Sequence, residues 1–322
     1  MVEKSFLSWI VMVLHITAVI LTLDVTSTEA GEEKYRFAVV PKSTSNPLFE
    51  RVREGCIKQA GKLGNVKCIY HGPVEYEPVT QARVVRDFIV SGIDGLAIAV
   101  ADAVSMTRVI NEAVKAGVPV VTFDSDAPNS SRTSYVSTNN QELGIALGKQ
   151  LLLSSSDGGK YAILTGGPDS LNLQKRVSGV RKALVGSGWK EVSGSPAYCR
   201  DDVAYAIRLM NDLKTANPDL KAIVSVGGWP MYAEEGYKKF VEQHQEDIKR
   251  GAFMLVVGDA LKVQLALLKG GYVTALVGQR PFSIGEEVIN VLAKIKEKHK
   301  VSPVVYTGFD VVTKDNVLDF LD

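Results

Sequence analysis

The sequence predicts an α/β fold with two similar lobes, each built on a parallel β-sheet. From Glu33 onward, short apolar runs alternate with amphipathic segments of helical period, which is the pattern of βαβ units. The apolar runs are continuous, as expected for parallel strands that helices cover on both faces. About ten such units follow one another, which is more than one sheet holds comfortably, so two sheets are expected.

The first half of the chain contains successive strand–helix units. Strand 35–40 precedes a helix over 47–63 whose apolar residues recur every three or four positions. Asn46 is a natural N-cap for this helix, Pro47 suits its first position, and Gly64 ends it. The segments that follow are predicted as strand 66–71, helix 78–92, strand 95–100, helix 105–117 and strand 118–124.

The second half repeats the alternation. Its predicted segments are helix 141–152, strand 160–167, helix 172–188, a weaker strand near 192–197, helix 203–215, strand 221–228, helix 231–245, strand 253–259, helix 260–269, strand 273–279, helix 284–297 and a last apolar stretch over 303–310. Strands separated by helices indicate right-handed crossovers and a second parallel sheet.

The 322 residues carry a formal net charge of +1, so composition gives no sign of nucleic-acid binding. At the N-terminus, Lys4 precedes an apolar run over 5–23, and the small residues Thr28 and Ala30 stand where a signal peptidase would cut. We therefore expect residues 1–30 to be a signal peptide cleaved near Ala30, and the location to be periplasmic or otherwise extracytoplasmic. An uncleaved membrane anchor is the alternative.

The chain has three cysteines, Cys56, Cys68 and Cys199. Cys56 falls on the apolar face of the first helix and Cys68 in the strand that follows it, and an exported protein can form disulfides. A Cys56–Cys68 bridge that leaves Cys199 free is one interpretation. The other is that Cys56 and Cys68 are small buried hydrophobic residues, and the sequence does not decide between them.

Polar and aromatic residues gather where the predicted strands end. Ligands of open parallel sheets bind beyond the carboxyl ends of the strands, so these residues are candidates for a binding site. The candidates are Lys42, Asn46, Phe49, Asp124, Asn172, Arg176, Trp229, Asp259 and Gln279. Carboxylates accept hydrogen bonds from hydroxyls, cations donate to oxygens, and rings cover C–H surfaces, so this mixture favours a sugar or polyol.

Several candidates also have a structural interpretation. Asp124 could cap a turn, and Asn46 can be an N-cap whether or not it touches a ligand. Phe49 lies on the apolar face of its helix, where core packing is as well supported as ligand stacking. Asp126 fits a turn better than a binding role. A solvated surface position is the alternative for two basic residues, Lys42 and Arg176.

The sequence lacks the motifs of common enzymes and metal sites. It has no G-x-G-x-x-G, P-loop or G-x-S-x-G stretch, and its four histidines have no metal-ligand spacing. Asp124 and Asp259 leave a paired-carboxylate glycosidase as a weak alternative. We therefore expect no catalytic residues, no metal and no cofactor.

Four stretches, taken together, resemble one protein family. They are FAVVPKSTSNPLFERVREGCIKQAGKLG, QARVVRDFIVSGIDGLAIAV, AVKAGVPVVTFDSDAP and ALVGQRPFSIGEE. In this order they resemble the sugar-binding type I periplasmic binding proteins, the ribose-binding-like components of ABC importers. The resemblance covers nearly all of the chain after about residue 34. It implies two Rossmann-like lobes joined by a three-segment hinge, over residues 34–138 with 281–306 and over 139–280 with 307–322.

The resemblance also suggests roles for the candidates. Asp124 and Asp259 are expected to accept hydrogen bonds from hydroxyls, and Arg176 is expected to donate. Lys42 matches only a subset of the family with Pro-Lys after the first strand, where it would face the ligand as well. The remaining contacts are expected from Asn46, Asn172, Gln279, Phe49 and Trp229. Departures from the ribose-binding pattern, which put ribose itself in doubt, occur at Leu48, Ser125, Gly227, Gly228, Trp229 and Asp259.

The predicted function is an exported solute-binding protein that captures a small neutral sugar or polyol and delivers it to an ABC transporter permease. Closure on the ligand is expected at hinges near 138–140, 279–282 and 307–310. The alternatives are binding of a furanosyl quorum signal (autoinducer) and presentation of bound sugar to a membrane chemoreceptor or sensor kinase. A sugar-responsive transcription regulator shares the fold, but the export segment stands where its DNA-binding domain would be. We expect a monomer without a nucleic-acid partner.

Overall fold

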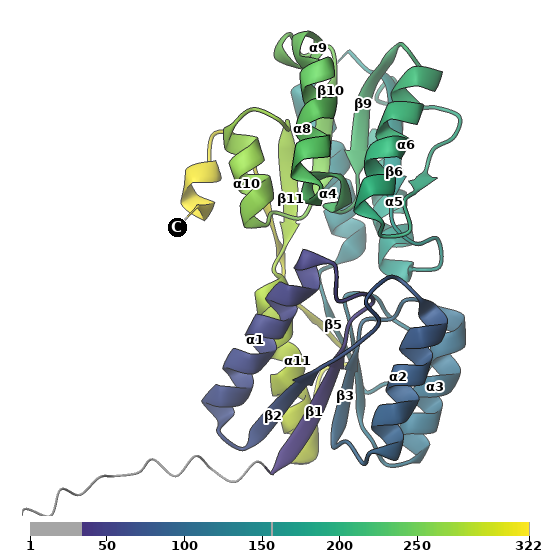
Figure 1. The fold of residues 1–322 in the computed structure, drawn as a ribbon, viewed down its shortest axis with the longest axis vertical. Coiled ribbons are helices and arrows are strands. Elements are labelled where there is room, and N and C mark those ends of the chain that lie inside the picture. Colours follow the sequence, from purple (N-terminus) through teal and green to yellow (C-terminus); the bar gives the residue numbers. More distant parts are fainter. Residues whose placement is uncertain (1–33, 156, 322) are drawn as a thin grey trace, which may run out of the picture. The chain divides into compact units, whose positions relative to one another are not determined.

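The computed structural model describes residues 34–155 and 157–321. The predicted signal peptide and its cleavage site near Ala30 lie outside the described residues. Within the described part of the chain, no helix is both long and apolar enough to cross a bilayer. These residues form two lobes, each a β-sheet with helices packed against it (Figure 1).

The first lobe is built on a six-stranded parallel sheet. Its strands are β1 (Tyr35–Val40), β2 (Val66–Tyr70), β3 (Gly95–Ile98), β4 (Val120–Phe123), β5 (Ser134–Ser137) and β12 (Val304–Tyr306), in the spatial order β12-β5-β4-β3-β1-β2. Its helices are α1 (Pro47–Leu63), α2 (Pro78–Val90), α3 (Ala103–Lys115) and α11 (Pro281–Lys296). The helices α1 and α11 pack together on one face, and α2 and α3 on the other, so each face has its own apolar core.

The second lobe is built on a seven-stranded sheet with one large apolar core. Its strands are β6 (Gly159–Thr165), β7 (Trp189–Glu191), β8 (Ala197–Tyr198), β9 (Leu220–Ser225), β10 (Met254–Gly258), β11 (Ala275–Gln279) and β13 (Phe309–Val312). Their order is β13-β11-β10-β9-β6-β7, with β8 also paired to β6, and only β13 runs antiparallel to its neighbour. The helices are α4 (Asn140–Ser154), α5 (Leu171–Leu184), α6 (Val203–Ala216), α7 (Trp229–Tyr232), α8 (Glu234–Gln243), α9 (Gln245–Lys249), α10 (Lys262–Lys269) and the 3-10 helix η1 (Val317–Phe320).

The chain passes between the two sheets three times. It leaves the first sheet after β5, returns after β11 and leaves again after β12. These passages fall at residues 138–139, 280 and 307–308, within the segments named as hinges from the sequence. A hinge motion at these segments stays a prediction.

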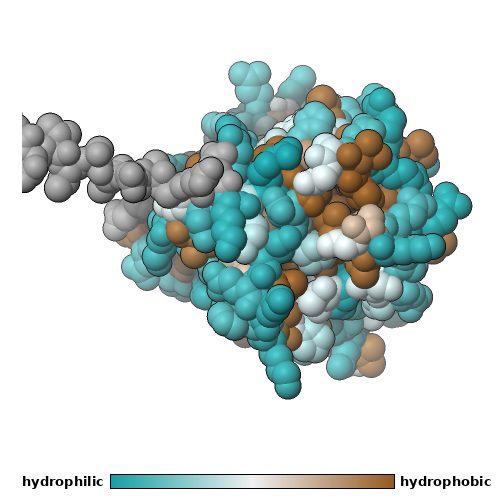
Figure 2. Space-filling model, turned by 90° about the horizontal axis from the view of Figure 1, so that it is seen from below, coloured by the Kyte–Doolittle hydropathy of each residue, from teal (hydrophilic) through white to brown (hydrophobic). Residues whose placement is uncertain are grey.

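The carboxyl ends of the first-lobe strands face the second lobe, whereas their amino ends lie at the far end of the lobe (Figure 1). Figure 2 shows this far end, where hydrophilic residues cover most of the surface and hydrophobic residues gather in one area. The polar residues named from the strand ends belong to the opposite side, where the two lobes meet.

The first helix shows how local sequence sets the elements. Asn46 Oδ1 accepts a hydrogen bond from the Leu48 backbone N–H at 3.0 Å, so Asn46 is the predicted N-cap. Gly64 ends the helix with a φ of 75°, a left-handed conformation that glycine adopts without strain. Both predictions are confirmed.

Three segments differ from the prediction. The single helix expected over 231–245 is three helices, because the backbone leaves helical angles at Ala233 and His244. The prediction of a strand near 192–197 is wrong. The strand β7 ends before this segment and β8 begins only at its last residue. Between the two strands the chain turns at Gly194, which has a φ of 83°. The strand β5 has no counterpart in the prediction because its sequence, SYVS, is half polar.

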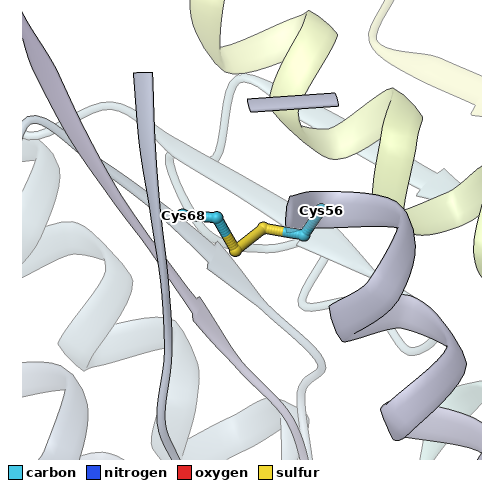
Figure 3. The surroundings of a disulfide bond; sticks show 2 residues. All are labelled: Cys56 and Cys68. Atoms are coloured by element: carbon cyan, nitrogen blue, oxygen red, sulfur yellow. A yellow bond between two sulfur atoms is a disulfide. The ribbon is translucent and has the colours of Figure 1, made fainter. Parts of the chain in front are cut away.

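The structure decides between the two interpretations of the cysteines. Cys56 and Cys68 form a disulfide that joins α1 to β2 (Figure 3). Their Cα atoms are 6.1 Å apart, within the usual range for a disulfide. Cys199 is free and buried, so we do not expect it to form a disulfide with another cysteine of the described chain.

Breaking this disulfide should lower the stability of the protein. Its two cysteines are 12 residues apart, and closing a loop of this length constrains the unfolded chain by about 3 kcal/mol. The double variant Cys56→Ala, Cys68→Ala should therefore melt roughly 6–10 °C below the native protein in thermal denaturation followed by circular dichroism. The native protein with reductant should melt close to the double variant. An unchanged melting temperature in both samples contradicts this expectation.

Candidate functional site

A cavity between the two lobes contains all nine candidate residues. It is lined by Lys42, Asn46, Leu48, Phe49, Asp124, Asn172, Leu173, Arg176, Asp201, Gly227, Trp229, Asp259 and Gln279. The candidates follow the carboxyl ends of β1, β4, β6, β9 and β10 or, for Gln279, end β11. The structure thus brings together every residue named from the sequence. Their contact with a ligand stays a prediction.

Asp124 is the centre of a buried polar network. Its Oδ2 lies 2.8 Å from Lys42 Nζ, and its Oδ1 accepts a hydrogen bond from Asn172 Nδ2 at 3.0 Å. Lys42 Nζ also donates to Asn172 Oδ1 at 3.0 Å. Lys42 is 3% exposed and Asp124 is 4% exposed, so Lys42 is not a solvated surface residue. Because Lys42 and Asp124 belong to the first lobe and Asn172 to α5 of the second, this network connects the lobes.

The backbone at Asp124 turns sharply out of β4. Its φ is 56°, a left-handed conformation that is uncommon for residues other than glycine, although Asp and Asn tolerate it. Its carbonyl oxygen accepts hydrogen bonds from the Tyr135 hydroxyl at 2.7 Å and the Ser137 hydroxyl at 3.0 Å. These bonds to β5 fix the turn. The unpredicted strand β5 therefore positions the carboxylate at the cavity.

Arg176 is a buried cation, which excludes the surface alternative. It is 2% exposed, and its Nε donates to Asn140 Oδ1 at 2.7 Å while Nη1 donates to the Val226 carbonyl at 2.9 Å. Its Nη2 lies 3.9 Å from Asp124 Oδ1 and has no hydrogen-bond partner among the described residues. The guanidinium group is thus held by two bonds, and its free end faces the cavity.

Asp259, like Asp124, is a carboxylate of the cavity that accepts hydrogen bonds from several donors. It accepts hydrogen bonds from the Gly228 N–H at 3.0 Å, the Tyr232 hydroxyl at 3.2 Å and Gln279 Nε2 at 3.0 Å. Burial, and then the charge of Asp259, raises the pKa of Tyr232 well above its usual value, so this hydroxyl stays a donor. Gln279 Oε1 is buried and has no partner among the described residues.

Two aromatic side chains line the same cavity. Phe49 is buried and meets Phe123 edge to face, with ring centroids 6.3 Å apart, so it belongs to the core and to the cavity wall at once. Trp229 begins α7, and its indole Nε1 is buried without a hydrogen-bond partner in the described chain. Asn46, the N-cap of α1, lines the cavity as well.

Asp126 has the structural role predicted for it. It accepts hydrogen bonds from Thr122 Oγ1 at 2.6 Å, from the Ala127 N–H at 2.9 Å and from Arg132 through Nε at 2.6 Å and Nη2 at 2.7 Å. It does not line the cavity. The two aspartates near the end of β4 thus have different roles, since Asp126 fixes the turn and Asp124 faces the cleft.

Asp201 is a cavity residue that the sequence reasoning missed. Asp201 follows β8, which ends at Tyr198. The predicted strand near 192–197 stops one residue earlier, so the prediction does not place the polar residues after Tyr198 at the end of a strand. A strand correctly ended at Tyr198 would have placed Asp201 among the candidates. Burial raises the pKa of Asp201 to about 6, and Lys42 acts in the opposite direction.

The polar side chains that line the cavity donate and accept hydrogen bonds. Among residues 34–155 and 157–321, no group of three His, Cys, Asp or Glu residues is suited to hold a metal ion. Asp124 and Asp259, the two carboxylates named from the sequence, each accept hydrogen bonds or an ion pair from several donors. These contacts suit recognition of a polar ligand.

Comparisons with known proteins agree with this architecture. The ribose import binding protein of Salmonella typhimurium is 24% identical over 300 residues, which cover 93% of this chain and 97% of that protein. The D-allose-binding periplasmic protein of Escherichia coli is 26% identical over 299 residues, with 89% and 92% covered. An ABC transporter solute-binding protein of Burkholderia graminis, solved with D-arabinose, is 28% identical with a TM-score of 0.81 and covers 90% of this chain and 99% of its own.

The match to a family model is broad. The model for the periplasmic binding protein domain matches residues 37–300, which contain every residue that lines the cavity and all strands of the two sheets except β12, β13 and the first two residues of β1. The relatives match over almost their whole length, so the two-lobed organisation is shared rather than a single motif. The chain therefore belongs to the periplasmic binding protein domain family, as the sequence resemblance predicted.

Proposed function

We propose that this chain is an exported solute-binding protein that captures a small neutral sugar or polyol between its lobes and delivers it to an ABC transporter permease. The relatives described above are named for ribose import, for D-allose binding and for an ABC transporter, and each matches most of the chain. The predicted signal peptide and the periplasmic relative support an extracytoplasmic location. The proposed role is binding without catalysis, by a monomer.

The observation that carries this proposal is a set of buried polar atoms without partners. Arg176 Nη2 and Trp229 Nε1 are donors and Gln279 Oε1 is an acceptor, and all three residues line the cavity. Leaving such atoms unpaired costs about 1–3 kcal/mol each, so a ligand that pairs with them gains affinity. Hydroxyl groups both donate and accept, which matches this mixture of atoms.

The remaining cavity residues fit the same ligand. The carboxylates of Asp124 and Asp259 would accept from hydroxyls, and Lys42 would donate to a ligand oxygen. The rings of Phe49 and Trp229 would cover the C–H surface of the sugar. The amides Asn46, Asn172 and Gln279 would fix its orientation.

Ligand binding would be coupled to closure of the lobes. Lys42 and Asp124 come from the first lobe, and Arg176 and Asp259 from the second, so one ligand contacts both. We propose that residues 34–138 with 281–306 move against residues 139–280 with 307–322 about the three passages between the sheets. A ligand that contacts both lobes favours the closed population, and this form would dock on the permease.

A thermal-shift screen tests the proposal. Pentoses, hexoses, deoxysugars and alditols are added singly, and at least one should raise the melting temperature because it binds only the native state. At a hundred times its Kd a ligand stabilises by about 2.7 kcal/mol, which corresponds to a rise of roughly 5–10 °C for a chain of this size. The expected result is a rise for a few related sugars. If no member of the panel changes the melting temperature, the proposed function is wrong.

A further inference from the structure

Asp201 stands where two cavities meet. It lines the inner cavity together with the residues described above. It also lines an outer cavity with Ser45, Asn46, Glu75, Asp202 and Val203. Asn46 and Asp201 are common to both, so the outer cavity is the mouth of the inner one.

The charges around these cavities are unequal. Five carboxylates line them, from Glu75, Asp124, Asp201, Asp202 and Asp259, against two cations, Lys42 and Arg176. Both cations face Asp124, at 2.8 Å and 3.9 Å. Asp259 accepts only from neutral donors, and Asp201 has no ion pair within the described part of the chain. The mouth end of the cavity is therefore rich in acceptors and short of positive charge.

The backbone directs the Asp201 side chain into the cavity. Arg200 and Asp201 have φ values of 53° and 61°, two successive left-handed residues of a kind that functional sites retain despite the strain. The carboxylate and the Trp229 ring pack over Gly166, where a Cβ atom would overlap both. Asp201 thus lies beside the Trp229 indole, and both side chains line the inner cavity. Burial raises the pKa of the Asp201 carboxyl, and the indole acts in the opposite direction.

We propose that Asp201 is the specificity-determining residue at the mouth end of the cavity, where its carboxylate accepts a hydrogen bond from a hydroxyl of an uncharged sugar and excludes sugar acids and sugar phosphates. This inference rests on the function proposed above and names its substrate class. An ionised carboxylate can only accept hydrogen bonds. It therefore pairs with a sugar hydroxyl, which can donate, and offers no hydrogen bond to the carboxylate of a sugar acid or to a sugar phosphate. The neighbouring carboxylates add like-charge repulsion.

The first test compares Asp201→Asn with the matched control Asp102→Asn. Asp102 lines neither cavity and caps α3 by accepting a hydrogen bond from the Ser105 N–H at 2.6 Å, a role that Asn also fills. With the best sugar of the panel, isothermal titration near pH 7.5 should give Asp201→Asn a Kd about tenfold or more above the native protein. Asp102→Asn should bind within about twofold of the native protein.

The second test uses pH. Four charged side chains face Asp201, those of Lys42, Asp124, Asp259 and the neighbouring Asp202. Three other titratable groups near it stay neutral, because burial raises the pKa of Cys199 and Tyr232 and raises that of Tyr76 to about 12. Since the ionised carboxylate binds the hydroxyl, affinity should be nearly full at about one pH unit above the pKa of about 6 and should fall as the pH drops through it. The native protein should lose about tenfold in affinity near pH 5, and Asp201→Asn should lose much less.

The outcomes separate this inference from the proposed function. If no sugar of the panel binds the native protein, the proposed function fails and this inference fails with it. If a sugar binds and Asp201→Asn retains native affinity at both pH values, only the role of Asp201 is wrong. Binding of the phosphate ester or the uronic acid of that sugar to the native protein, with an affinity near that of the neutral sugar, also overturns it.

Discussion

Replacing Asp124 with Asn should abolish sugar binding while the protein stays folded. The Asp124 carboxylate joins Lys42 and Asn172 and lies on the cavity wall, so its charge acts on both lobes and, in the proposed function, on the ligand. Each charge-assisted hydrogen bond lost costs about 1.5–3 kcal/mol, and two such bonds correspond to a fall in affinity of about a hundredfold or more. Isothermal titration with the best sugar of the panel measures this loss.

Asn is chosen because it keeps the shape and the backbone of the position. Asn tolerates the φ of 56° that Asp124 adopts, so the turn after β4 is not strained further. The variant does leave Lys42 buried without its counter-ion, which destabilises by about 3–5 kcal/mol. Circular dichroism and urea denaturation should therefore show a folded protein with lowered stability.

A double variant separates the loss of binding from the loss of stability. Adding Lys42→Met to Asp124→Asn removes one of the two buried cations that lose the Asp124 charge, so part of the stability should return, while Arg176 keeps its bonds to Asn140 and Val226. Binding should not return, because the acceptor for the sugar hydroxyl is still neutral. If Asp124→Asn binds within about threefold of the native protein, or if the double variant recovers affinity, Asp124 is not a ligand contact.

The nine candidate residues were predictable because a topological rule places them. Parallel strands point their carboxyl ends to one side of a sheet, so residues such as Asp124 and Asp259, which are far apart in sequence, line one cavity. The rule needs only the strand ends, and for β4 and β10 the apolar runs mark them clearly. Periodicity therefore sufficed to predict which residues come together at this cavity, and their contact with a ligand stays a prediction.

The sequence did not predict Asp201 or the connection between the lobes. The strand before Asp201 has two residues, and a run this short has no hydrophobic period to detect. The ring formed by Lys42, Asn172 and Asp124 joins residues up to 130 positions apart, and it depends on where α5 lies against the first lobe. Such a contact follows from tertiary packing, which local patterns do not encode.

Helix packing in the second lobe is also fixed by tertiary structure, and it determines where Arg176 lies. The helices α4 and α5 approach so closely that a Cβ atom on Gly144 would overlap the Arg176 carbonyl oxygen, and one on Gly179 would overlap the Gln141 carbonyl oxygen. Asn140 on α4 holds the Arg176 guanidinium at 2.7 Å. The spacing of these helices therefore sets the position of a cavity residue.

Gly144→Ala should destabilise the protein and weaken sugar binding together. The added methyl group meets backbone, which cannot rotate away, so α5 must shift, at a cost of about 3 kcal/mol or more. We expect a fall of roughly 6–12 °C in melting temperature, and about a tenfold rise in Kd because Arg176 moves with its helix.

The matched control is Gly61→Ala on α1, where nothing lies within 4 Å of the added Cβ atom. This change should raise stability by about 0.5–1 kcal/mol, because alanine favours the helix more than glycine does, and it should leave Kd unchanged. A Gly144→Ala protein that melts and binds like the Gly61→Ala protein contradicts the idea that helix spacing holds Arg176. Loss of stability with unchanged Kd restricts the role of Gly144 to packing, because Arg176 would then be positioned by Val226 and Asn140 alone.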